Sequence, residues 1–198
     1  MKNAVAGLVA AAWLSASSAT AEPFQSFVDT CLAADADAPA VATLAKNDWF
    51  AMPAGTAPDM GKDFRDPVIY LSFDPSSMKQ AAPEAFEILV TGWGDGETTF
   101  KNDRLIFDAC GLMSSEADSR ALSRDVTTHL GFSSKMIDEM RVWMFSRNAE
   151  GFVSEASLMD GDGETILTTA QKRRLYVLYV IDEGDMAGLF LGAIRPQP

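Results

Sequence analysis

The sequence predicts an α+β domain in which helices pack on one face of a mostly antiparallel sheet. Three observations lead to this prediction. Apolar residues recur with helical spacing near the N-terminus and again in residues 116–130. The last third of the chain contains apolar segments of strand length joined by short links, and short links make neighbouring strands antiparallel. Helices that precede and interrupt such a run of strands are typical of the α+β class.

The first half of the domain is expected to contain three helices and three strands. Residues 24–34 place apolar side chains at helical spacing, and a second short helix follows with Val41, Leu44 and Ala45 facing inward. The segment 52–66 is rich in Gly, Pro and Asp, which predicts a loop. The other elements expected here are a strand over 67–73, a short helix from Asp74 to about Ala82, and strands over 85–93 and 105–113.

The second half begins with the clearest helix, residues 116–130. Ser115 and Asp118 form a capping signature at its start. Residues 134–147 fit both helical and strand spacing, and we expect a short helical turn followed by a strand over 139–147. Further strands are expected over 152–158, 175–181 and 187–194. The segment 175–181 is apolar on both faces, which predicts a central position in the sheet.

The five-residue pattern Gly-Asp-Gly-Glu-Thr occurs twice, at 94–98 and 161–165. Asp-Gly pairs suit tight β-turns, because Gly readily adopts a positive φ. We therefore expect two hairpins that use the same turn chemistry, rather than a duplicated unit.

The first 21 residues have the composition of a cleavable secretory signal. Lys2 precedes an apolar stretch of 11 residues, and Ala19-Thr20-Ala21 matches the A-x-A cleavage pattern. A membrane-spanning helix needs about 20 apolar residues, so this stretch is too short to be an anchor. We expect cleavage after Ala21, which leaves residues 22–198 as one exported domain that does not span a membrane. Its expected location is the periplasm, with secretion as the alternative.

The chain is strongly acidic, with a formal net charge of −12 that becomes −13 when Lys2 leaves with the signal. Such a surface repels nucleic acid and anionic lipid, because both bind proteins mainly through Lys and Arg. The charge suits either solubility or a basic partner.

Cys31 and Cys110 are the two cysteines of the chain. An even number of cysteines in an exported protein predicts a disulfide, which here would join the first helix to a strand in mid-chain. The alternative is a redox-active pair, but such pairs usually form a C-x-x-C motif.

Three alternating carboxylates, Asp160, Asp162 and Glu164, resemble part of a calcium-binding loop. Thr165 and Gln171, however, occupy positions where an EF-hand has Gly and Glu. We expect a solvated hairpin tip, with a weak cation site as the alternative.

The single histidine, His129, cannot by itself supply a metal site built on two or three histidines. We expect it in the last turn of the long helix, where it interacts favourably with the helix dipole. No G-x-S-x-G motif accompanies it, so a serine triad is not expected. No glycine-rich phosphate-binding motif occurs, and no cofactor is expected.

The remaining conspicuous side chains are expected to have structural roles. Lys172-Arg173-Arg174 precede the most apolar strand, where charges discourage aggregation; contact with an acidic partner is the alternative. Met136, Met140 and Met144 are expected to pack in the core, although methionine-rich surfaces can also bind partners or soft metals. With 28 acidic residues, no catalytic carboxylate pair can be singled out.

The chain resembles a loose group of uncharacterised signal-peptide proteins from alphaproteobacteria. The shared features are an early helix with Phe24, Phe27 and Cys31, a strand that carries a second cysteine (Cys110), a helix that ends in Leu130-Gly131, and a strand with Trp143. The resemblance implies a periplasmic setting and carries no activity.

These observations predict an exported periplasmic binding or accessory protein that has no catalytic site of its own. The partner, an envelope protein or a small ligand, is not specified by the sequence, and neither is the oligomeric state. One alternative is a carboxylate-dependent envelope hydrolase, which needs only two suitably spaced acids. The other is a carrier that encloses a small apolar ligand in a cavity.

Overall fold

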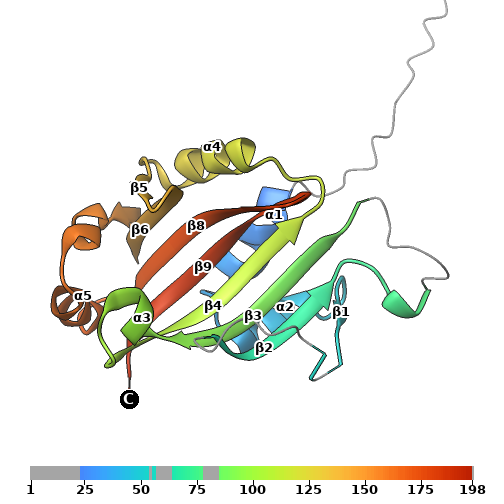
Figure 1. Cartoon of the computed structure of the whole chain (residues 1–198), viewed down its shortest axis with the longest axis horizontal. Helices are drawn as coiled ribbons and strands as arrows, with labels where there is room; N and C mark the ends of the chain where they lie inside the picture. Colours follow the sequence, from blue (N-terminus) through green and yellow to red (C-terminus); the bar gives the residue numbers. More distant parts are fainter. Residues whose placement is uncertain (1–22, 54, 57–63, 78–84, 198) are drawn as a thin grey trace, which may run out of the picture.

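The structure is a computed structural model that describes residues 23–53, 55–56, 64–77 and 85–197. It confirms the α+β class: nine strands form one antiparallel sheet in the order β1-β2-β3-β4-β9-β8-β6-β5, and β7 also pairs with β6 (Figure 1). The strands are β1 (Phe50–Ala51), β2 (Phe64–Leu71), β3 (Glu87–Asp95), β4 (Leu105–Ser114), β5 (Lys135–Ile137), β6 (Met140–Asn148), β7 (Gly151–Ser154), β8 (Leu175–Glu183) and β9 (Met186–Pro196).

Helices pack against both faces of this sheet. The helical segments are α1 (Pro23–Phe27), which continues as the π-helical turn η1 (Val28–Leu32), α2 (Ala38–Ala45), the 3-10 turn η2 (Pro75–Ser77), α3 (Gly96–Phe100), α4 (Ser119–Leu130), the 3-10 turn η3 (Ala156–Asp160) and α5 (Gly163–Ala170). Helices α1, α2 and α4 contact one face, which we call the helix face; in Figure 1, α1 and α2 lie behind the strands. Helices α3 and α5 lie at one end of the opposite face, which we call the second face.

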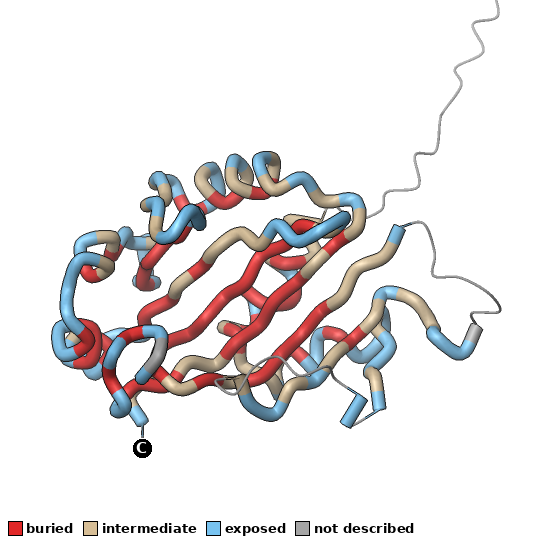
Figure 2. Tube along the Cα trace, in the orientation of Figure 1, coloured by how far each residue is buried: buried red, intermediate tan, exposed pale blue. Residues whose placement is uncertain are grey.

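The main hydrophobic core lies on the helix face. Because side chains alternate along a strand, Leu89, Cys110, Leu191 and Leu178 point to the same side of four neighbouring strands. Their cluster also includes, from the helices and the remaining strands, Phe27, Leu32, Val41, Leu122, Val126, Leu130, Trp143 and Phe145. Figure 2 shows that β4 and β9, in the middle of the sheet, are buried along most of their length.

A smaller core lies on the second face, at the end of the sheet where β4 and β8 begin. Leu105 and Leu175 are fully buried there. They pack against Ile166, Leu167 and Ala170 of α5 and against Phe100 of α3. This layer covers that end of the second face.

The predicted disulfide is present and joins η1 to β4. Cys31 and Cys110 are fully buried, their Cα atoms lie 5.3 Å apart, and 79 positions separate them in the sequence. The bond therefore fastens the N-terminal helical segment to the middle of the sheet, and it is consistent with an oxidising compartment. The predicted signal, residues 1–21, lies outside the described residues.

The predicted central strand is confirmed, because β8 pairs with β9 on one side and with β6 on the other. Strand β9 lies between β4 and β8, so it joins the two halves of the sheet. Both edges of the sheet are poorly suited to pairing with further strands. Pro67 and a register shift interrupt β2, and the opposite edge consists of the short strands β5 and β7.

The prediction of two hairpins at the Gly-Asp-Gly-Glu-Thr repeats was wrong. Each copy begins a helix: Gly96 is the first residue of α3, and Gly163 is the first residue of α5. Asp162 caps α5 by accepting a hydrogen bond from the Thr165 backbone N–H at 2.8 Å. Asp-Gly suits both a turn and a helix start, and here the apolar residues after the second copy pack onto the sheet as a helix.

Several boundaries also differ from the predictions. The long helix begins at Ser119 rather than 116, because the Asp118 carboxylate caps it through the Ala121 N–H. The predicted helical turn before β6 is the strand β5, because a tight turn at Asp138-Glu139 folds it back onto β6. The other differences are residues 64–66, which belong to β2 rather than a loop, residues 156–158, which belong to η3 rather than a strand, and Leu44, which is exposed. The predicted helix after Asp74 is described only as η2, and its remainder lies outside the described residues.

Candidate functional sites

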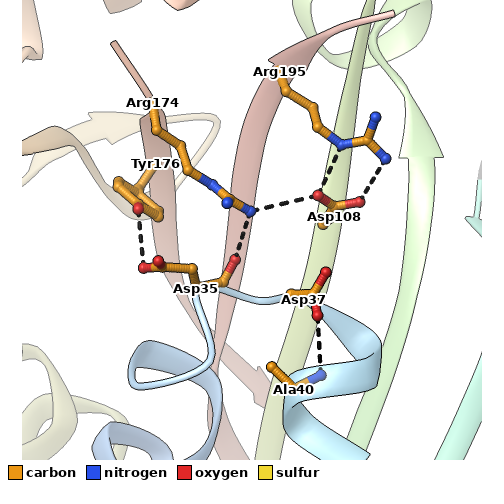
Figure 3. Close-up of polar contacts among 7 residues, drawn as sticks. All are labelled: Asp35, Asp37, Ala40, Asp108, Arg174, Tyr176 and Arg195. Atoms are coloured by element: carbon orange, nitrogen blue, oxygen red, sulfur yellow. Dashed lines mark hydrogen bonds and ion pairs between the residues drawn. The ribbon is translucent and has the colours of Figure 1, made fainter. Parts of the chain in front are cut away.

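An ion network surrounds the loop between η1 and α2, at one end of the helix face (Figure 3). Asp35 and Ala36 both have positive φ, which turns the loop sharply back toward the sheet. The Asp35 carboxylate accepts hydrogen bonds from Tyr176 and from Arg147, each at 2.9 Å. The Asp35 carbonyl oxygen accepts a further hydrogen bond from Arg174 at 3.1 Å. The loop is therefore held by side chains from β6, from β8 and from the residue that precedes β8.

Asp108 of β4 extends the same network (Figure 3). Its two carboxylate oxygens accept hydrogen bonds from Arg195 at 2.9 and 3.0 Å, a bidentate arrangement. Arg174 approaches Asp108 to 3.5 Å. Burial, and then the hydrogen bond to Asp35, raise the pKa of Tyr176 to about 12, so this phenol stays protonated at neutral pH. Because the acids and arginines of the network are paired with one another, its role is to fasten the loop.

The three carboxylates of the suspected calcium loop do not point toward a common centre. Asp160 is ion-paired with Lys135, and Glu164 is ion-paired with Arg104. Asp162 is occupied as the cap of α5, where hydrogen bonds from Thr165 lower the pKa of its carboxyl. Within the described residues, no group of three or more His, Cys, Asp or Glu side chains is arranged to hold a metal ion.

Two residues of the basic run Lys172-Arg173-Arg174, which precedes β8, form structural ion pairs. The sequence had predicted instead that these charges discourage aggregation. Arg173 binds Glu155 through two nitrogens, at 2.7 and 2.8 Å. The Glu155 side chain is 8% exposed and also accepts a hydrogen bond from Ser146 at 2.7 Å. Arg174 belongs to the Asp35 network, and Lys172 is exposed.

The methionine prediction holds for one of its three residues. Met144 is buried beside α5, whereas Met136 and Met140 are 59% and 44% exposed. The difference follows from the strand conformation of residues 135–137, which places these two side chains on an edge hairpin instead of a helix face.

His129 lies in the last turn of α4, as predicted, but its surroundings oppose a positive charge. The imidazole contacts the rings of Phe24 and Phe152, with centroids 5.6 and 5.3 Å away. Partial burial, and then the nearby Arg147 guanidinium, lower the pKa of His129 below 6.5. Burial and Arg147 therefore disfavour the positively charged imidazole that would interact favourably with the helix dipole.

This environment makes the stability of the protein depend on pH. The folded chain takes up the His129 proton at lower pH than the unfolded chain, so this contribution to stability is complete above pH 6.5 and is lost as the pH falls through the folded pKa. We expect urea unfolding at pH 7.5, 6.5 and 5.5 to show a falling free energy of unfolding, with a shallower fall in His129→Gln. Because the chain has no other histidine, equal slopes in the two proteins would contradict this assignment.

The second face carries an apolar surface beyond the α3–α5 layer, which sequence reasoning did not single out. We call it the apolar strip. Its residues alternate with the core residues on the same strands, and they are Phe64, Ile69, Leu71, Ile88, Val90, Met113, Tyr179, Ile181 and Phe190. Most are only half-buried. In Figure 1, no described helix crosses the middle of this face.

Three aromatic rings contact one another across the apolar strip, and glycines make room for two of them. A Cβ atom on Gly92 would lie 2.5 Å from the Phe64 ring, and one on Gly111 would lie 2.9 Å from the Phe190 ring. The centroid of Phe190 is 6.2 Å from that of Phe64 and 5.0 Å from that of Tyr179. The three rings therefore form a continuous row over β2, β3, β4, β9 and β8. Burial raises the pKa of Tyr179 to about 12, which keeps its hydroxyl a hydrogen-bond donor.

One end of the apolar strip is bordered by two acidic turns. The register of β6, β8 and β9 places the turn at Asp138-Glu139 and the turn at Glu183-Gly184-Asp185 at the same end of the sheet. None of these four carboxylates is ion-paired with another residue in the described part of the chain. Helices α3 and α5 cover the opposite end of the second face. The uncovered end of the apolar strip is therefore the end that carries the acidic turns.

Comparisons of the chain with family models, with curated proteins and with solved structures found no match. Among the helices that the structure describes, none is long and apolar enough to cross a membrane.

Proposed function

We propose that this chain is an exported accessory protein of the bacterial periplasm, and that it binds another envelope protein through the apolar strip. The observation that carries the proposal is the row of Phe64, Phe190 and Tyr179 on the second face. Aromatic rings supply large contact areas with few rotatable bonds, and they are enriched at protein interfaces. The disulfide supports the periplasmic setting, together with the export signal that the sequence predicts.

Charge indicates the kind of partner. The chain has a net charge of −12, and unpaired carboxylates border the end where the apolar strip opens. A second copy of the chain or an anionic lipid surface would bring like charges together there. A polypeptide segment that combines apolar residues with Lys or Arg would bury its apolar side on the rings and place its basic side near the two turns.

The alternatives find less support. A carrier for a small apolar ligand would enclose it in an apolar cavity, whereas two hollows in the described structure are lined mainly by polar and charged residues. A carboxylate hydrolase needs an acid that is free to exchange protons with its substrate. Glu155, the most buried of the described carboxylates, is bound instead to Ser146 and Arg173.

Site-specific photocrosslinking in cells of the native organism tests this proposal. A photoreactive phenylalanine analogue would replace Ile88, Met113 or Ile181 in the apolar strip, or Leu44 as a control. Leu44 is a 45% exposed apolar residue on α2, on the helix side of the molecule. We expect one adduct of the same mass from the three apolar-strip positions, containing a second protein whose crosslinked segment is apolar and basic, and none from Leu44.

Other results would reject the proposal. They are the absence of adducts at all three positions, equal yields from Leu44, adducts only with a second copy of this chain, and adducts only with lipid. Neutralising the acidic end with Glu183→Gln and Asp185→Asn should reduce the adduct yield, because the charge attraction would be weaker.

A further inference from the structure

A polar hollow on the helix face lies outside the apolar strip and shares with it only the acidic turn at Asp138-Glu139. It has a volume of about 390 Å³ and lies between α4 and the hairpin of β5 and β6. The charged side chains that line it, together with Ser119, come from α4, from the β5–β6 hairpin and from β8. They are Ser119 and Arg120 of α4, Asp138 and Glu139 of the turn before β6, Arg141 of β6, and Asp182 of β8. Its volume lies in the range of small-molecule sites, roughly 300 to 1,000 Å³.

The arginines of this hollow differ from most others in the chain. Six of the described arginines form ion pairs, all with Asp or Glu. Arg120, Arg124 and Arg141 have no side-chain hydrogen bond or ion pair with any residue that the structure describes. Two of these three guanidinium groups, Arg120 and Arg141, line the hollow, and they approach it from a helix and from a strand. Their hydrogen-bond donors are therefore free for a ligand.

Negative charge lines the same hollow. Asp138 and Glu139 are exposed and are not ion-paired with other described residues. Asp182 accepts a hydrogen bond from the Ser119 hydroxyl at 2.6 Å, which uses one of its two carboxylate oxygens. The hollow thus holds two guanidinium groups and three carboxylates that do not neutralise each other by direct contact.

We propose that this hollow binds a free amino acid or short peptide with a basic side chain. The ligand's α-carboxylate would bind Arg120 and Arg141, because a guanidinium group matches a carboxylate in shape and charge. Its ammonium groups would bind Asp138, Glu139 and Asp182. A ligand that carries only negative charge would be repelled by the three carboxylates. A ligand that carries only positive charge would be repelled by the two arginines. The excess of one negative charge favours a zwitterion that carries one additional positive charge.

Calorimetric titration of the mature protein with L-lysine tests this proposal directly. We expect saturable binding at low ionic strength, and an at least tenfold weaker affinity in Arg120→Gln, Arg141→Gln and Asp182→Asn. Arg124→Gln is the matched control, because Arg124 lies one turn further along α4, is also unpaired and does not line the hollow. It should bind L-lysine like the unmodified protein. Thermal melting of each variant, expected to be unchanged, separates lost binding from lost folding.

Modified ligands test the assigned contacts. The methyl ester of lysine lacks the carboxylate, and Nα-acetyl-lysine lacks the α-ammonium group, so both should bind at least tenfold more weakly than lysine. Absence of saturable binding by L-lysine, equal weakening in Arg124→Gln, or full affinity for the methyl ester would overturn the proposal. It does not depend on the apolar strip, and Ile88→Glu should leave lysine binding unchanged.

Discussion

Replacing Cys31 and Cys110 together by alanine is expected to lower the free energy of unfolding by about 4 to 5 kcal/mol. The bond closes a loop of 79 positions, and the chain-entropy model assigns this amount to a loop of that length. Both side chains are fully buried, so alanine avoids placing a hydroxyl group in the core. Because single domains are typically stable by only about 5 to 15 kcal/mol, the variant should lose a large part of its total stability.

Urea unfolding followed by tryptophan fluorescence measures this difference. The unmodified protein should lose the same stability when a reducing agent is added, whereas the double variant should not respond to it. If the double variant does not accumulate, refolding of the reduced, unmodified chain provides the same comparison. A loss below about 1 kcal/mol in both experiments would show that the bond contributes little to the stability of the domain.

Gly188→Ala is expected to be the most damaging single substitution in β9, with a loss of about 3 kcal/mol or more. A Cβ atom at this position would lie 2.1 Å from the Leu112 carbonyl oxygen and 2.6 Å from the Met113 sulfur. Overpacking of a core typically costs about 1 to 3 kcal/mol. The cost here should reach or exceed the upper end, because the nearest atom belongs to the backbone of the adjacent strand.

Gly192→Ala is the matched control in the same strand. Its Cβ atom would approach a methyl group of Val177 to 3.0 Å, and that side chain can move slightly. We expect a loss of about 1 kcal/mol or less, consistent with mild overpacking. Equal unfolding free energies for the two variants in urea would contradict the steric argument.

Much of the fold could be predicted because its strongest elements carry clear local signals. Residues 175–181 combine strand-forming side chains with apolar character on both faces, and they form the interior strand β8. Leu122, Val126 and Leu130 lie on one side of the long helix and are all buried. The disulfide was predicted from the even number of cysteines together with the predicted export signal. In each case, the local sequence contains the physical cause of the structure.

The errors occurred where the same residues suit two local structures. Asp followed by Gly can occupy a hairpin turn or cap a helix, and the choice at Gly163 depends on a contact distant in sequence. A Cβ atom there would lie 2.3 Å from the Phe100 carbonyl oxygen, so α5 begins against the end of α3. Met136 and Met140 likewise suit a helix and a hairpin, and the left-handed turn at Asp138-Glu139 selects the hairpin.

The candidate sites were harder to predict than the fold. The apolar strip uses residues that alternate with core residues on the same strands, and a sequence cannot show which strand face the helices cover. Arg120 and Arg141 belong to no motif, and only the absence of a described partner distinguishes them from the six paired arginines. A signal for either site would have required knowledge of long-range pairing.

The position of β9 in the sheet has a consequence for how the protein is made. Strands β1 to β4 form one side of the sheet and β5 to β8 the other, and β9 is the strand between them. During synthesis, the two sides cannot be joined until residues 186–196 have been made. Up to that moment β4 and β8 each present an unpaired edge. The sheet therefore cannot close into one unit until this last strand pairs with both β4 and β8.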